Sequence, residues 1–167
     1  TLRELRDEVS TDAARFFYVM RSHDQHLDFD LDLANSRTNE NPVFYIQYAH
    51  ARFCSVFRNL EDMDDRHNVE IGNVALDLLT EDHELQLMRN ISRFTETIDS
   101  AARLRSPHLL ALYLHSLATD LHSYYNAHQF LIEDENLRNA RLNLIHATRT
   151  VLAKGLGLLG VSAPEEM

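Results

Sequence analysis

The chain has 167 residues, of which 44% are hydrophobic and 25% charged, and its formal net charge is −10. This composition excludes global disorder, and the acidic balance counts against nonspecific nucleic-acid binding, because lysine and arginine supply most of that affinity. The 4 glycines and 3 prolines favour long helices over a sheet with many turns, so we expect an all-α fold. A single cysteine, Cys54, and the absence of any run of 18 apolar residues predict a cytoplasmic protein with no membrane partner.

The N-terminal segment is expected to be a connector. Apolar residues between 2 and 9 predict a short helix, and Thr11 is the expected N-cap of a second helix. Residues 27–33 alternate leucine or phenylalanine with aspartate, which is typical of a half-buried strand or an extended segment. The apolar side chains of the connector, Phe16 and Phe17 among them, are expected to pack on a domain that the chain does not contain.

A helical bundle is predicted for the rest of the chain. Four main helices are expected, at about 42–59, 80–102, 107–124 and 135–159. An acidic loop at 61–72 and a short helix at 74–79 separate the first two, and Gly160 is the expected left-handed C-cap of the last. We place the domain boundary at residue 38, so that the connector covers 1–38 and the helical domain 39–167.

Tyr45, Tyr48 and Arg52 form the most informative pattern in the sequence. At 3.6 residues per turn they share one helical face. Planar rings and a planar cation are what an unpaired RNA base stacks on. Aromatic residues at this spacing also fill cores, so the spacing alone leaves a core role open. Tyr124 and Tyr125 are adjacent and cannot both face one core, so at least one ring is expected at a surface.

Other motifs have simpler structural interpretations. Gly155-x-Gly157-x-x-Gly160 matches a dinucleotide-binding pattern but has no strand before it and no helix after it, so these glycines are expected to end a helix. The segment His23 to His26 is expected to be a helix end, and Cys54 a small buried hydrophobe. Three histidines recur every seven residues, about 10 Å apart along a helix and too far to share a metal ion, and are expected to form a wet stripe beside the core: His108, His115 and His122.

Four stretches of the chain resemble, in order, the C-terminal half of bacterial-type arginyl-tRNA synthetases. They are Asp12 to Phe17, Asn41 to Arg52, Leu137 to Leu142 and Leu159 to Met167. The second resembles the start of the anticodon-binding domain, and the third resembles the stretch that gives the helical DALR-type domain its name. Glu135-Asn136 stand where that family often shows Asp-Ala. The His-Ile-Gly-His and Lys-Met-Ser-Lys-Ser signatures of the catalytic half are absent, and the chain begins at Thr1, so we expect a C-terminal fragment.

The resemblance implies a function for the intact enzyme and a smaller one for this chain. The intact enzyme would attach arginine to tRNA using ATP with magnesium, as a monomer, whereas this fragment would need no cofactor and would be inactive alone. Its partners would be arginine tRNA, held by the anticodon arm, and its own catalytic domain. The resemblance places five residues at the anticodon: Tyr48, Arg52, Tyr125, Asn126 and Met167.

Two alternatives remain open from the sequence. One is a helical protein-interaction domain whose tyrosines lie in the core, which full burial of Tyr48 and Arg52 with no adjoining groove would favour. The other is the related helical domain of another class I synthetase, such as the cysteinyl enzyme.

Overall fold

The chain forms a helical bundle in the computed structural model, which describes residues 8–26, 28–63 and 65–167. Within these residues the fold is all-α, without strands, as the composition predicts. The helices are α2 (Thr11–Val19), α3 (Leu31–Asn35), α4 (Pro42–Asp62), α5 (Val69–Val74), η1 (Leu76–Leu78, a 3-10 turn), α6 (Asp82–Ser92), α7 (Phe94–Arg103), α8 (His108–Ala127) and α9 (Glu135–Leu158). The short helix predicted at residues 2–9 falls almost entirely on residues 1–7, outside the described part.

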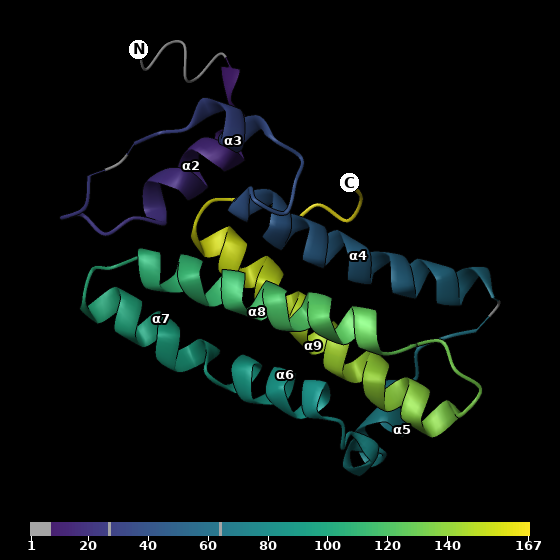
Figure 1. Cartoon of the computed structure of the whole chain (residues 1–167). Coiled ribbons are helices and arrows are strands. Elements are labelled where there is room, and N and C mark those ends of the chain that lie inside the picture. Colours follow the sequence, from purple (N-terminus) through teal and green to yellow (C-terminus); the bar gives the residue numbers. More distant parts are fainter. Residues whose placement is uncertain (1–7, 27, 64) are drawn as a thin grey trace.

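Helix α8 is the centre of the bundle. It contacts α4, α6, α7 and α9, and Figure 1 shows α4 on one side of it and the α6–α7 pair on the other. The face of α8 that meets these neighbours is a continuous apolar stripe, in which Leu114, Leu117, Leu121 and Tyr124 are fully buried. No helix in the described part of the chain is long and apolar enough to cross a membrane.

Helices α2 and α3 lie at the N-terminal end of α4 (Figure 1) and differ from expectation in two ways. Phe16 and Phe17 are only 1% and 5% exposed, so both rings are part of this core and do not form an exposed patch. The predicted extended segment ends at residue 30, because Asp30 caps α3 by accepting a hydrogen bond from the Leu33 backbone amide at 2.9 Å. An N-cap therefore overrides the alternating pattern. Of that segment, Leu27 lies outside the described residues.

Several helix boundaries are also set by caps that the periodicity did not indicate. Ser10, not Thr11, caps α2, and Asn68 caps α5, so α5 begins inside the loop predicted at 61–72. Glu81 and Glu84 form a capping box at the start of α6. The helix predicted through residue 102 breaks at Arg93, which ends α6 and precedes α7.

The end of α9 and the residues after it form a tail that lies along α4. Gly160 has φ +69°, and the Val161 amide donates to the Leu156 carbonyl at 3.0 Å, which is the Schellman arrangement expected of a C-terminal glycine. Gln47 then donates to the Ser162 carbonyl at 3.0 Å. The Pro164 carbonyl accepts a hydrogen bond of 2.8 Å from Nδ1 of His50.

Candidate nucleic-acid interface

Arg52 is the centre of a cluster in which α4 and α8 bring predicted site residues together. Its guanidinium carbon lies 3.8 Å from the ring centre of Tyr125, a cation–π contact. Its Nη2 donates to Oδ1 of Asn126 at 3.0 Å, and its Nη1 lies 3.3 Å from Nδ1 of His122. Three contacts thus hold one guanidinium group, and Arg52 and Tyr125 remain partly exposed.

Tyr48 lies on the same face of α4, one turn before Arg52. Its ring is stacked with that of Phe44, at 6.0 Å and 14°, and with that of His122, at 5.6 Å and 28°. The side chain is partly exposed, so an incoming planar group can contact it. Tyr45 packs against His122 at 4.5 Å between ring centres and contributes to the α4–α8 contact.

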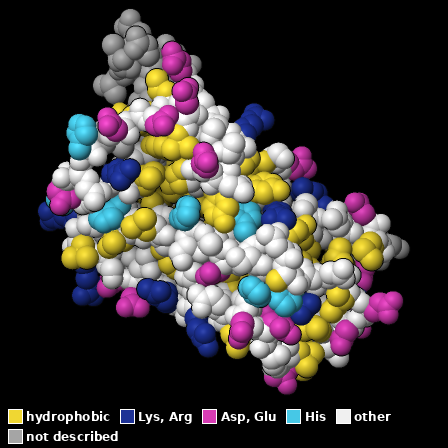
Figure 2. All heavy atoms as spheres, viewed as in Figure 1, with side chains coloured by type: hydrophobic (Ala, Val, Ile, Leu, Met, Phe, Trp, Pro, Cys, Tyr) yellow, Lys and Arg dark blue, Asp and Glu magenta, His cyan; other side chains and the backbone are white. Residues whose placement is uncertain are grey.

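A hollow of about 670 Å³ adjoins this cluster at the C-terminal end of α8. Among the described residues its lining contains no aspartate or glutamate, although the whole chain has a net charge of −10. Figure 2 shows hydrophobic, histidine and basic side chains side by side along the boundary of α4 and α8, while most acidic side chains on this face lie around its rim. The residues that line the hollow are Val56, Asn59, Tyr125, Asn126, Ala127, His128, Gln129, Phe130 and Leu131.

The loop that forms one wall of this hollow is fixed by the stretch Leu137 to Leu142. Arg138 donates to the Ile132 carbonyl at 2.7 Å, and Arg141 donates to the Gln129 carbonyl at 2.9 Å. The arginines of this stretch therefore support the site indirectly, because they donate hydrogen bonds to the carbonyls of the loop that lines it. Arg141 is only 9% exposed, so it does not itself form part of the surface.

Arg141 in turn belongs to a buried network. Its Nε donates to Oε1 of Glu84 at 2.9 Å, and the Tyr124 hydroxyl donates to the same oxygen at 3.0 Å. Burial, together with the neighbouring Glu84, raises the pKa of Tyr124 well above its usual range, so this hydroxyl stays a donor. The network ties α6, α8 and α9 together beneath the hollow.

Met167, the fifth predicted site residue, lies at the end of the tail and is 56% exposed. The residue before it, Glu166, has its carboxylate 3.8 Å from Nη1 of Arg58, so the tail reaches α4 about two turns beyond Arg52. Tyr48, Arg52, Tyr125 and Asn126 are brought together by direct contacts, whereas in the described part of the chain no hydrogen bond or ion pair links Met167 to them. The place of Met167 in the site stays a prediction.

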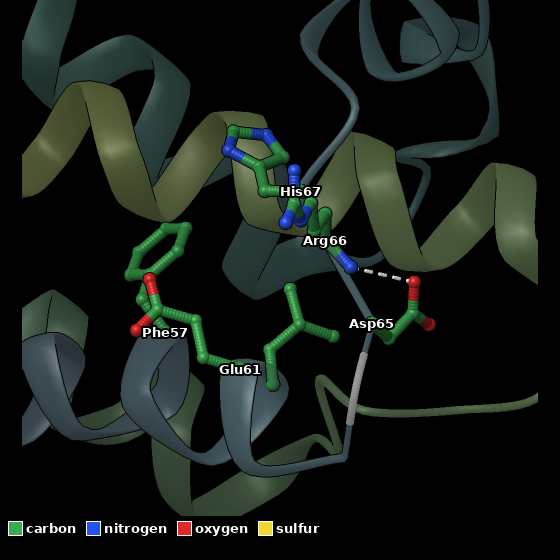
Figure 3. Close-up of a pocket in the computed structure, with 6 residues that line it drawn as sticks. Phe57, Glu61, Asp65, Arg66 and His67 are labelled. Carbon is green, nitrogen blue, oxygen red and sulfur yellow. Dashed lines mark hydrogen bonds between the residues drawn. The ribbon is translucent and has the colours of Figure 1, made fainter.

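A second hollow, of about 520 Å³, lies on another side of α4 (Figure 3). Phe57 lines it. Phe57 follows Tyr48 by nine residues, which is two and a half turns of helix, so the two side chains lie on opposite faces of α4. Glu61 and Asp65 add carboxylates to its lining, and Figure 3 shows Glu61 beside Phe57 and Asp65 beside Arg66. Those carboxylates would repel a phosphate backbone, so this hollow is the weaker candidate.

His122 is the residue of the cluster that the sequence pattern did not identify. The seven-residue spacing predicts His122 in a solvent-exposed stripe with His115. His115 is exposed, but His122 is only 7% exposed and contacts both Arg52 and Tyr48. The sequence feature that could have identified His122 is its spacing from Tyr125. It precedes Tyr125 by three residues and so shares its helical face.

The comparisons with known proteins agree on the fold. A family model described as the DALR anticodon binding domain matches residues 46–167. Arginine–tRNA ligases from Thioalkalivibrio sulfidiphilus and Coxiella burnetii are 59% and 60% identical to this chain over 167 residues. All of this chain is covered in each case, but it spans only 28% of the length of either relative.

Solved structures resemble the whole bundle. A Campylobacter jejuni protein superposes with a TM-score of 0.86 at 27% identity, over 98% of this chain and 35% of that chain. The arginyl-tRNA synthetase of Thermus thermophilus superposes with a TM-score of 0.78 at 34% identity, over 93% of this chain and 26% of that one. With the family model covering most of its length, this chain belongs to the DALR anticodon-binding domain family.

Proposed function

We propose that this chain is the tRNA-binding part of an arginine–tRNA ligase and that the Arg52 cluster holds the anticodon loop of arginine tRNA. The observation that carries this proposal is the meeting of Tyr48, Arg52, Tyr125 and Asn126 on one partly exposed surface, beside a hollow whose described lining residues include no carboxylate. Rings, a guanidinium and an amide together can stack on bases and bond to their edges.

The chemistry of such a surface suits an RNA loop better than a duplex. Each base that stacks on an aromatic ring contributes about 1–3 kcal/mol, and stacking does not depend on a high positive charge. A chain with a net charge of −10 can therefore bind RNA through a few aromatic and arginine contacts. Oδ1 of Asn126 accepts a hydrogen bond from Arg52, and its side-chain NH₂ group can still donate to a base edge.

The rest of the function is assigned to the intact enzyme. Arginine activation with ATP and magnesium would take place on the part of the enzyme that this chain does not include, so no residue here is given a role in that chemistry. The 59% and 60% identity to proteins named arginine–tRNA ligase supports arginine tRNA as the partner in preference to cysteine tRNA. We expect the intact enzyme to be a cytoplasmic monomer.

The alternative of a helical protein-interaction domain required Tyr48 and Arg52 to be buried without an adjoining groove. Both are partly exposed, and Tyr125, which lies against Arg52, lines a hollow. The surface geometry therefore favours the RNA-binding proposal.

The test is a tRNA titration with the full-length enzyme at fixed salt. Tyr48→Leu removes the ring and should weaken binding of arginine tRNA by about 5- to 100-fold, whereas Tyr48→Phe keeps the ring and should bind within about twofold of the wild type. Equal affinities for both variants and the wild type, with unchanged thermal unfolding, would sink the stacking role. Competition between purified arginine and cysteine tRNAs decides the partner, and preference for cysteine tRNA would overturn the arginine assignment.

A further inference from the structure

His122 makes two hydrogen bonds that together define its protonation state. Nε2 lies 3.2 Å from the Tyr45 carbonyl oxygen, which only accepts, so Nε2 must carry a hydrogen. Nδ1 lies 3.3 Å from Nη1 of Arg52, which only donates, so Nδ1 must offer a lone pair. Only the neutral imidazole with its hydrogen on Nε2 satisfies both partners.

His122 is also too deeply buried to serve as a broad contact surface itself. It is 7% exposed and packs against the rings of Tyr45, at 4.5 Å, and Tyr48, at 5.6 Å. Its influence on a ligand must therefore pass through neighbours that reach the surface, and Arg52 is the one to which it is hydrogen-bonded.

We propose that His122 is a positioning residue, which holds the Arg52 guanidinium over the Tyr125 ring and so prepares Arg52 for the anticodon loop. This inference rests on the proposed function. A free arginine side chain loses up to about 2 kcal/mol of conformational entropy when it is ordered, and a site that orders it beforehand avoids that loss on binding. The imidazole, the Tyr125 ring and the Asn126 amide share this task, from three directions around one guanidinium.

The arrangement depends on pH. Protonation of His122 would place an N–H on Nδ1 directly opposite the cationic Arg52, which removes the acceptor and adds a like charge. The groups facing His122 are Tyr45, Tyr48 and Arg52 on α4, and His115 lies against Tyr45 from α8 itself, so no carboxylate among these groups compensates. Burial, and then the Arg52 charge, lower the pKa of His122, which keeps it neutral near pH 7.

Two substitutions separate the two hydrogen bonds of His122. In His122→Asn, the amide oxygen can take the place of Nδ1 and still accept from Arg52, whereas in His122→Gln the amide nitrogen can take the place of Nε2 and donate to the Tyr45 carbonyl. Binding of arginine tRNA to the full-length enzyme at pH 7.5 should stay within about twofold of the wild type for His122→Asn and fall about 5- to 10-fold for His122→Gln.

A double-mutant cycle with Arg52→Ala shows whether His122 acts through Arg52. In the Arg52→Ala background, His122→Gln should cause no further loss of affinity, because the group that it positions is gone. Additive losses, or equal losses for His122→Asn and His122→Gln, would mean a general structural role and would overturn the inference. If Arg52→Ala itself leaves tRNA affinity unchanged, the proposed interface fails and the inference fails with it.

The dependence of tRNA affinity on pH provides a second measurement, which does not require His122→Gln to fold. Wild-type affinity should fall between pH 7.5 and pH 5.5 more steeply than that of His122→Asn, which has no imidazole at this position. Parallel profiles for the two proteins would overturn the pH-dependent part of the inference. Thermal unfolding of each variant at each pH shows whether the compared proteins are folded.

Discussion

The guanidinium carbon of Arg52, on α4, lies 3.8 Å above the ring centre of Tyr125, on α8. A lysine at position 52 would keep the charge but lose both the planar stacking and the fork that also reaches Asn126. The cluster is therefore expected to depend on the shape of this cation and not only on its charge.

Arg52→Lys tests that dependence. We expect the affinity for arginine tRNA to fall about 3- to 30-fold, with the slope of log affinity against log salt unchanged because the charge is kept. Titrations at several salt concentrations measure both quantities. Arg103→Lys is the matched control, since Arg103 is exposed on α7 and pairs with Asp99, and it should bind as the wild type does. Wild-type affinity for Arg52→Lys would mean that charge alone matters at this position.

Met167→Ala tests whether the end of the tail belongs to the interface. Because Met167 is 56% exposed, its truncation should leave the thermal unfolding midpoint unchanged. If it walls the anticodon site, tRNA affinity should fall by about 2- to 10-fold, from the loss of its apolar contacts. Leu158→Ala provides a control of similar kind, since Leu158 is 61% exposed and lies at the end of α9. Equal affinity of Met167→Ala and the wild type would remove Met167 from the site.

The α4 half of the site could be predicted because helical periodicity is a local property. Tyr48 and Arg52 share a face in any fold that contains this helix. The meeting of Arg52 with Tyr125 and Asn126 depends on how α4 is placed along α8, which is set by the packing of many buried side chains. No spacing within one segment contains that information, so only the family resemblance indicated these residues together.

The differences between expected and observed helices have a related cause. The alternation of residues 27–33 is a weak pattern, and a single carboxylate on Asp30 is enough to start α3 in its place. Similarly, the apolar spacing continues smoothly past Arg93, although α6 ends there. Apolar patterns report which side chains face the core, while caps decide where a helix starts and stops.

Glu84→Ala is expected to be strongly destabilising. Glu84 is fully buried and accepts from Arg141 and Tyr124, so its removal leaves a buried guanidinium without its carboxylate. Losses of this kind are about 3–5 kcal/mol in unfolding free energy, measurable by urea denaturation. Arg103→Ala, which breaks the exposed pair with Asp99, should cost less than about 1 kcal/mol. Similar costs for the two variants would contradict the assigned role of the buried network.

Stability should fall as the pH is lowered below 7. Burial is the first cause that lowers the folded pKa of His50, His122 and His146, so the unfolded chain takes up protons at a higher pH than the folded one. A histidine whose pKa is lowered by folding contributes its full stability at pH values above its pKa in the unfolded chain, about 6.5. That contribution is lost as the pH falls through its pKa in the folded chain. Urea midpoints at pH 7.5, 6.5 and 5.5 measure the trend. His122→Asn should lose less stability over this interval than the wild type, and an equal loss would contradict the contribution of His122.

Two glycines in helices are expected to respond in opposite directions to alanine. At Gly72, in α5, an added Cβ would lie 2.5 Å from the Asn139 carbonyl oxygen, so α5 could not keep its close approach to α9. Gly72→Ala should lower the unfolding free energy by about 1–3 kcal/mol. At Gly157, in α9, the added Cβ meets nothing within 4 Å, and Gly157→Ala should raise the unfolding free energy by about 0.5–1 kcal/mol through helix propensity. Urea denaturation of both variants distinguishes the sites, and a stabilising Gly72→Ala would show that the contact between α5 and α9 is looser than the structure describes.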